Sequence, residues 1–138
     1  MAMVEIRVPV SVGELLDKIA ILEIKSERIT EPNKRENVLR ELAALRMVWE
    51  ESPLSRLDLE ALRRALREVN ERLWDIEDAI RDKERQGDFG AEFIELARSV
   101  YLQNDERARI KREINLRTGS ALVEEKSYRE YRRDGAPA

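Results

Sequence analysis

Polar and aromatic residues recur along two predicted helices at positions where a bundle would bury apolar side chains. Beside the apolar seam of residues 59–80 runs a stripe with spacings of four and three that contains Asn70, Trp74, Glu77 and Arg81. In the following helix, Gln103, Asn104 and Arg107 interrupt an otherwise apolar face. Amides and guanidinium groups are costly to bury without partners, so these side chains must be paired, hydrated or lining a cavity. We therefore predict an inter-helix ligand site formed by Trp74, Glu77, Asp78, Arg81, Tyr101, Asn104, Asp105, Arg107 and Lys111.

The same residue types allow three interpretations. A tryptophan among charged groups can stack on a small ligand or on a guanidinium, which favours a pocket for a phosphorylated sugar or nucleotide. A buried polar layer can instead serve only to fix helix register and oligomeric state. Alternatively, the polar face binds a partner protein. In an antiparallel hairpin Glu77 and Asp78 are expected near Asn104 or Arg107.

An enzymatic alternative depends on carboxylates, because the chain contains neither histidine nor cysteine. Imidazole and thiolate chemistry are excluded, and a metal would have to be a hard cation such as Mg²⁺. Glu68-x-x-Glu71 and Glu92-x-x-Glu95 are similar to the metal-binding pattern of all-helical MazG-like nucleotide pyrophosphohydrolases, although Glu95 stands where that pattern has Asp. The seam directs Glu68 and Glu71 away from the core, so we expect a binding protein rather than an enzyme. Magnesium belongs only to the alternative, and otherwise no cofactor is expected.

The charge distribution leaves a second alternative. The net charge is -3, yet residues 98–133 carry 10 basic and 6 acidic side chains. A basic C-terminal third can bind nucleic acid, but a modest excess like this is more typical of a solvated helix face, so nucleic-acid binding is not expected. No apolar run approaches the ~20 residues of a membrane span and no signal peptide is recognisable, so the sequence predicts a cytoplasmic protein without membrane contact.

The elements that would position these residues are helices. Ser11 and Glu14 form a capping-box pattern that opens a helix reaching about Arg28, and a second helix ends at Ser52-Pro53. The third carries an unbroken heptad seam, and the fourth spans about 91–116. A short last helix is expected within 120–131. The seam consists of Leu59, Leu62, Leu66, Val69, Leu73, Ile76 and Ile80.

We therefore predict an all-α fold, an antiparallel bundle of about four helices built on a long helical hairpin. Residues 1–10, with alternating Val4, Ile6, Val8 and Val10, form a short extended N-terminal arm, residues 11–131 the bundle, and residues 132–138 a frayed tail. The seam favours a homodimer that associates through it or beside it.

Five segments resemble an uncharacterised bacterial family of short all-helical proteins, a domain of unknown function. The resemblance spans roughly residues 9–131 and begins with the motif V-G-E-L-L-D-K-I-x-I-L-E-I-K. It implies a stand-alone bacterial domain associated with surface-polysaccharide synthesis and sugar transfer, and it brings no assigned catalytic residues. The segments are Ser11–Lys25, Leu73–Arg81, Phe93–Tyr101, Asn104–Asn115 and Glu124–Tyr128.

Overall fold

The described part of the chain is all-α. The computed structural model describes residues 3–133, which contain four α-helices, one short 3₁₀ helix and no strand. The elements are α1 (Val12–Arg28), α2 (Pro32–Glu51), η1 (Pro53–Arg56), α3 (Glu60–Gln86) and α4 (Ala91–Thr118). The predicted fold class is confirmed, and the predicted helix boundaries are reproduced to within a few residues.

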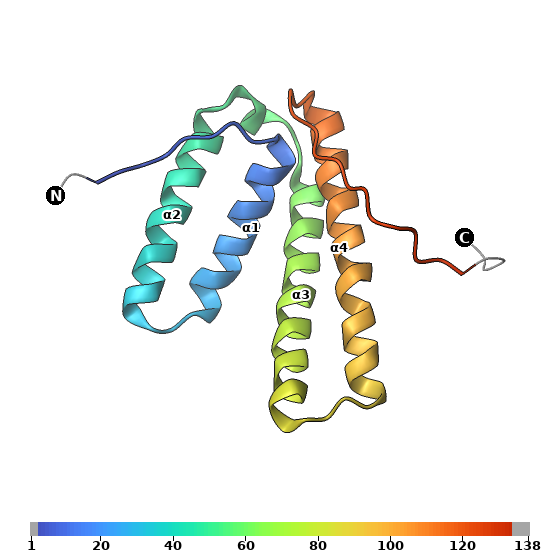
Figure 1. The fold of residues 1–138 in the computed structure, drawn as a ribbon. Coiled ribbons are helices and arrows are strands. Elements are labelled where there is room, and N and C mark those ends of the chain that lie inside the picture. The colour runs from blue at the N-terminus through green and yellow to red at the C-terminus, as the bar shows by residue number, and fades with distance from the viewer. Residues whose placement is uncertain (1–2, 134–138) are drawn as a thin grey trace.

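The helices form two antiparallel hairpins that share one core. Helix α1 packs on α2, α3 and α4, whereas α2 packs mainly on α1. The α3–α4 hairpin is longer and extends well beyond the end of the α1–α2 pair (Figure 1). Helix α1 is therefore the central element, and side chains on its face reach both helices of the long hairpin.

Local sequence signals explain where the helices begin and end. The Ser11 hydroxyl accepts a hydrogen bond from the Glu14 backbone N–H at 3.1 Å, as the capping-box pattern predicts. Glu31 caps α2 in the same way, with Pro32 in the first turn. Gly87 and Gly119 end α3 and α4 in the left-handed region, with φ values of 68° and 65°. Residues other than glycine rarely adopt this backbone conformation.

The heptad seam of α3 is used inside the molecule. Leu59, Leu66 and Val69 are buried against Leu16, Ile19, Ile110 and Ile114. The remaining seam residues, Leu62, Leu73, Ile76 and Ile80, are half-buried. Because α1 and α4 pack against α3, this seam is not a free surface through which a second copy could associate.

The two terminal segments are extended. Residues 3–11 contain no helix and leave the bundle as an arm, as predicted. The short helix expected within 120–131 is wrong: Gly119 ends α4, and the chain turns back along α4 in extended conformation. Few apolar residues recur there at helical spacing, and ion pairs of Glu124 and Glu125 with Lys111 and Arg112 hold this C-terminal tail (residues 119–133) instead. Of the predicted frayed tail, residues 134–138 lie outside the described residues.

Helices α1 and α4 come unusually close at Gly13. The Gly13 backbone N–H donates to Asn115 Oδ1 at 2.7 Å. A Cβ atom added to Gly13 would lie 2.5 Å from the Lys111 carbonyl oxygen, which is well inside van der Waals contact with a backbone atom. Only glycine therefore allows this approach.

Replacement Gly13→Ala should lower the free energy of unfolding by about 2 kcal/mol or more, because α1 and α4 must separate to admit the methyl group. Urea denaturation followed by circular dichroism measures the effect. Gly90→Ala is the matched control, since its added Cβ meets only the exposed Asp88 side chain at 3.3 Å. Equal destabilisation by the two variants would contradict the close-approach explanation.

Candidate functional site

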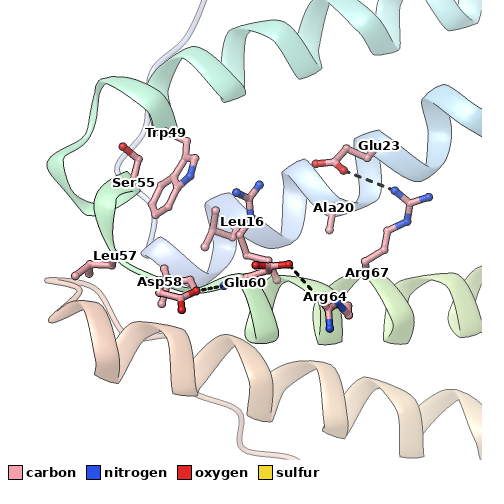
Figure 2. A pocket seen from close by; sticks show the side chains of 12 residues that line it. Leu16, Ala20, Glu23, Trp49, Ser55, Leu57, Asp58, Glu60, Arg64 and Arg67 are labelled. Atoms are coloured by element: carbon pink, nitrogen blue, oxygen red, sulfur yellow. Dashed lines mark hydrogen bonds and ion pairs between the residues drawn. The ribbon is translucent and has the colours of Figure 1, made fainter.

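A first recess lies where α1, η1 and the start of α3 meet. Its volume is about 430 Å³, and Trp49, Leu59 and Leu16 form its apolar wall. Figure 2 shows that its charged groups face one another: Arg64 pairs with Glu60, and Arg67 pairs with Glu23. Arg67 also binds Glu27 and Glu71, while the Arg63 guanidinium stacks over the Trp49 ring. None of the predicted site residues lines this recess.

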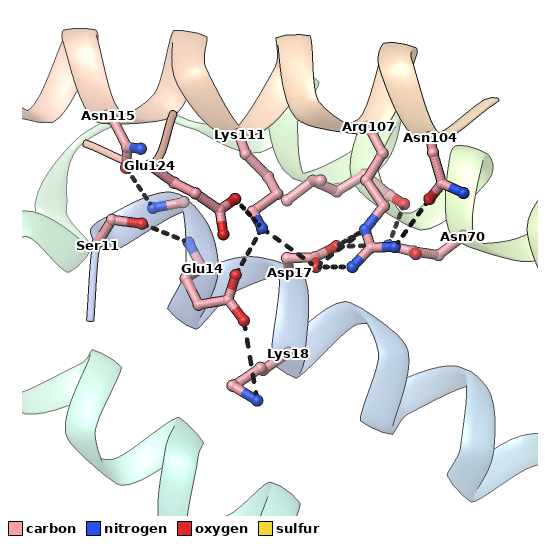
Figure 3. Close-up of polar contacts among 12 residues, drawn as sticks. Ser11, Glu14, Asp17, Lys18, Asn70, Asn104, Arg107, Lys111, Asn115 and Glu124 are labelled. Atoms are coloured by element: carbon pink, nitrogen blue, oxygen red, sulfur yellow. Dashed lines mark hydrogen bonds and ion pairs between the residues drawn. The ribbon is translucent and has the colours of Figure 1, made fainter. Parts of the chain in front are cut away.

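The centre of the polar layer is Asp17, a residue of α1 whose side chain is 1% exposed. Its carboxylate accepts from Arg107 Nε at 3.1 and 3.2 Å and from Arg107 Nη2 at 2.9 Å. A third helix contributes through Asn70, whose side-chain amide donates to Asp17 Oδ1 at 2.9 Å. Side chains from α1, α3 and α4 thus meet at one buried carboxylate (Figure 3).

This geometry explains the polar interruption of α4. Arg107 crosses to α1, and its Nη1 donates to Asn104 Oδ1 at 3.2 Å, which orients the guanidinium. Gln103 lies on the α3 side and accepts from Arg72 Nε at 2.9 Å. The carboxylate that binds Arg107 is that of Asp17. The two carboxylates expected from the sequence, on Glu77 and Asp78 of α3, are exposed to solvent instead.

Lys111 forms a second junction one turn further along α4. Its ammonium group donates to Glu14 Oε2 at 2.5 Å and to Glu124 Oε1 at 3.0 Å, and lies 4.0 Å from Asp17. Burial alone would lower the pKa of Lys111, but the hydrogen bonds to Glu14 and Glu124 outweigh it and raise that pKa. Lys111 therefore stays charged and joins α1, α4 and the C-terminal tail.

The backbone N–H groups at the start of α1 form hydrogen bonds with α4 and with the residue that follows its end. The Gly13 N–H donates to Asn115, and the Val12 N–H donates to the Ser120 hydroxyl at 3.2 Å. Within residues 3–133 no buried side-chain nitrogen or oxygen lacks a hydrogen-bond partner. The carboxylates of Glu14, Asp17 and Glu124 are joined by Arg107 and Lys111, and we call this set of five side chains the closed ion layer. The exposed Lys18 and Lys126 lie at its edge, each 3.8 Å from one of these carboxylates.

The predicted site residues do not share one recess. Trp74, Glu77, Asp78 and Arg81 line a recess of about 400 Å³ between α1 and α3. Tyr101, Asn104, Asp105 and Lys111 line another, of about 360 Å³, between α4 and the C-terminal tail. Arg107 contributes to both, and its contact with Asp17 lies between them.

The α1–α3 recess has an apolar floor and self-paired charges. Ile21, Ile24 and Leu73 form the floor. The half-buried Trp74 ring is covered by the Arg28 guanidinium, which lies 5.6 Å from the ring centroid and also binds Asp75 at 2.6 Å. Glu77 and Arg81 form an exposed pair at 3.3 Å. The tryptophan therefore already has a cationic partner.

The α4–tail recess presents aromatic and amide groups to solvent. Tyr101 and Tyr128 lie on it, with Asn104, Asp105 and Lys126, while Arg107 and Lys111 close its floor. Tyr101 also packs on the Tyr131 ring at 5.1 Å. Desolvation and the nearby negative charge of Asp105 raise the pKa of the Tyr131 phenol. These contacts hold the tail as one wall of the recess.

Sequence reasoning missed Asp17, Glu14 and Glu124 as members of the site. Besides apolar side chains, the buried face of α1 contains Gly13 and Asp17. The available signal was their spacing: Gly13 precedes Asp17 by one helical turn, which places a small residue and a carboxylate on the same face of the helix.

The four glutamates of the metal alternative are not brought together. Glu71 binds Arg67, and Glu92 binds Lys83 near the hairpin turn. The pairs Arg72–Gln103 and Lys83–Glu92 fix the antiparallel register and place Glu68 more than about 20 Å along the hairpin from Glu92. In the described range, no three acidic side chains lie close enough to hold a metal ion.

Several basic side chains of the C-terminal third are paired with nearby carboxylates. Arg109 binds Glu106, Arg112 binds Glu125, and Arg117 binds Glu113. These pairs use acidic groups of the same segment, so its excess of basic side chains remains.

The fold and the closed ion layer define a small all-α bundle with several surface recesses. The chain matches a family of unknown function (DUF6165) over residues 6–137 and belongs to this family. The predicted membership of an uncharacterised family is thereby confirmed. No curated protein and no solved structure matches the chain. Among the described helices, none is both long and apolar enough to cross a membrane.

Replacement Asp17→Leu should lower the free energy of unfolding by about 3–5 kcal/mol, because Arg107 and Lys111 lose a buried counter-charge. The double variant Asp17→Leu, Arg107→Leu should recover much of this loss, since it removes both members of the pair. Chemical denaturation measures both variants. Glu77→Gln is the control, with an expected change within about 0.5 kcal/mol for an exposed pair. A double variant no more stable than Asp17→Leu would contradict the assigned pairing.

A pH dependence follows from Glu124. The hydrogen bond from Lys111 holds the pKa of Glu124 below its usual 4.5, despite some desolvation. Because this pKa is lower in the folded protein than in the unfolded chain, the pair stabilises the fold above pH 4.5, and this contribution is lost as the pH falls through the folded-state value.

The stability advantage of the wild type over Glu124→Gln should therefore be present at pH 6 to 7 and decrease as the pH falls below 4.5 and through the folded-state pKa of Glu124. Urea titrations across this pH range measure it. Glu125→Gln, which removes an exposed pair with Arg112, is the control and should show a smaller difference throughout. A pH-independent difference for Glu124→Gln would contradict the role of its ionised carboxylate.

Proposed function

We propose that this protein is a non-catalytic binding protein that holds a phosphorylated sugar in the α4–tail recess. The observation that carries the proposal is the closed ion layer beneath that recess. It fixes Arg107 and Lys111 in place and leaves Tyr101, Asn104 and Tyr128 directed toward the recess. Because these side chains are already held in place, little conformational entropy is lost when a ligand binds, and such a recess is suited to binding.

The charged groups of the layer favour binding over acid–base catalysis. A lysine acting as a general base needs a pKa lowered toward neutrality. The pKa of Lys111 is shifted in the opposite direction, because Glu14 and Glu124 stabilise its charged form. Its ammonium group is also occupied by those carboxylates, at 2.5 and 3.0 Å, and is not free to exchange a proton with a ligand.

The groups facing the recess indicate the ligand class. Tyrosine rings offer flat apolar faces with a polar edge, which suit the faces of a sugar ring. Asn104 and Asp105 supply donors and acceptors for hydroxyl groups. Lys126, whose side chain is 47% exposed and lies 3.8 Å from Glu124, is the cation with most freedom to contact a phosphate. The bacterial, cytoplasmic setting of sugar transfer that the family resemblance implies is part of the same proposal.

A partner-protein function is the second candidate, because the chain exposes much surface. A compact monomer of this mass would expose about 7,500 Å², whereas this chain exposes 10414 Å². The difference exceeds the ~800 Å² that one partner buries in a standard interface. The extended arm and the C-terminal tail contribute to this excess of exposed surface. Formation of a homodimer would bury part of it.

Isothermal titration calorimetry should detect binding of glucose 1-phosphate or a uridine diphosphate sugar, and much weaker binding of glucose. Lys126→Ala and Tyr101→Ala should each weaken binding of the phosphorylated probes about fivefold to tenfold, or ~1–1.4 kcal/mol. Arg81→Ala, in the α1–α3 recess, is the control and should bind normally. Absence of heat with both phosphorylated probes at millimolar concentration, or equal loss with Arg81→Ala, would overturn the proposal.

A further inference from the structure

The N-terminal arm is an extended segment with alternating apolar and charged side chains. Val4, Ile6 and Val8 are 86%, 84% and 68% exposed. Since side chains of an extended chain alternate between two sides, these three share one face and Glu5 and Arg7 share the other. No hydrogen bond between backbone groups involves residues 3–10, so both edges of the strand are free within the described chain.

Such a strand is a template for pairing with another strand. The apolar face cannot be covered by the seam of α3, which α1 and α4 already cover. The end of α2 beside the start of α1 also exposes Met47 and Val48, which are 60% and 55% exposed. A ribbon formed by the arm would therefore leave the bundle next to an apolar surface on which its own apolar face could pack.

The sequence of the arm is complementary to itself in the antiparallel direction. Around Ile6 the order is Val4-Glu5-Ile6-Arg7-Val8. When two copies pair about this residue, Ile6 faces the partner's Ile6 and Val4 faces the partner's Val8. Each Glu5 then faces the partner's Arg7 on the opposite side of the ribbon. Opposite charges directly across an antiparallel pair are stabilising, and this arrangement provides two such pairs.

Pro9 selects the hydrogen-bonding phase of this pairing. Antiparallel strands alternate between hydrogen-bonded and non-hydrogen-bonded pairs. If the two Ile6 residues form a hydrogen-bonded pair, Val4 and Val8 do so as well, and Pro9 occupies a non-hydrogen-bonded position. Its backbone nitrogen then points away from the partner strand, where the missing N–H costs no ladder hydrogen bond.

We propose that two copies of this chain associate through an antiparallel β-ribbon formed by residues 4–8 of each copy and centred on Ile6. The intrachain contact between Glu5 and Arg7, 3.0 Å long and exposed, is exchanged for two equivalent contacts between copies. The ribbon is remote in sequence from the ligand recess, so this proposal stands independently of the proposed function.

Cysteine cross-linking tests the register, because the chain has no cysteine of its own. A mixture of Val4→Cys and Val8→Cys, one carrying a mass tag, should form a mixed disulfide under mild oxidation. Each variant alone should not, since the two copies of residue 4 are about 13 Å apart in this register, too far for a disulfide. Ile6→Cys should cross-link by itself, since the Cα atoms of a facing pair are about 5.5 Å apart.

Lys34→Cys, at an exposed position of α2, reports random collision and should give little cross-linked product. Cross-linking of Val4→Cys alone as efficient as in the mixture would overturn the antiparallel register. If the wild-type chain sediments as a monomer at about 100 µM and no combination of the cysteine variants gives a cross-link, the ribbon itself is overturned.

A charge exchange tests the same pairing without cysteine. Glu5→Arg and Arg7→Glu should each weaken self-association about fivefold or more, because both cross-strand pairs become repulsive. A mixture of the two variants should associate as the wild type does, since every facing pair is again of opposite sign. Sedimentation equilibrium measures all three samples. A mixture no tighter than either variant alone would contradict the facing of Glu5 and Arg7.

Discussion

The arrangement of the bundle depends on the neutralisation of one buried carboxylate. Asp17 lies at 1% exposure on the helix that contacts all the others, and a carboxylate there is tolerated only with a well-placed cation and further donors. Arg107 supplies two guanidinium nitrogens and Asn70 an amide, each from a different helix. The rotation of α1, α3 and α4 about their axes is therefore fixed together, in a way that interchangeable apolar side chains would not fix it.

The recesses are by-products of this constraint. Arg107 and Lys111 must reach inward to Asp17 and Glu14, which leaves shallow space on either side of their aliphatic stems. Lys111 also reaches Glu124 and so draws the C-terminal tail over α4, where the tail becomes the wall of one recess. The same side chains, Arg107 and Lys111, therefore line the proposed ligand recess and hold the helices together. Gly13 permits the close contact between α1 and α4 on which these interactions depend.

Much of the fold follows from sequence, because periodicity and caps are local signals. The heptad seam of α3, the Ser11 cap and the glycine-rich turn each depend on residues close in the chain, and all three are confirmed. The nine predicted site residues all line a recess, but they do not share one. The partner of Arg107 lies 90 positions earlier, and nothing local distinguishes Asp17 from Glu77 or Asp78 as that partner. The prediction of a helix in the C-terminal tail was wrong for a related reason. The extended course of the tail depends on ion pairs with α4 and not on the periodicity of its own sequence.

The C-terminal tail joins the bundle through ion pairs and few buried apolar contacts, and its residues from 121 to 133 are exposed. Dissolved salt weakens an exposed ion pair such as Arg112–Glu125 most, the partly buried pair Lys111–Glu124 less, and the apolar packing of the core not at all. The molecule therefore combines parts that respond differently to ionic strength: a bundle set by apolar packing and a recess wall set largely by screened charges. Concentrated salt would loosen the wall long before the helices separate, so the shape of the α4–tail recess is a property of the surrounding electrolyte as much as of the fold.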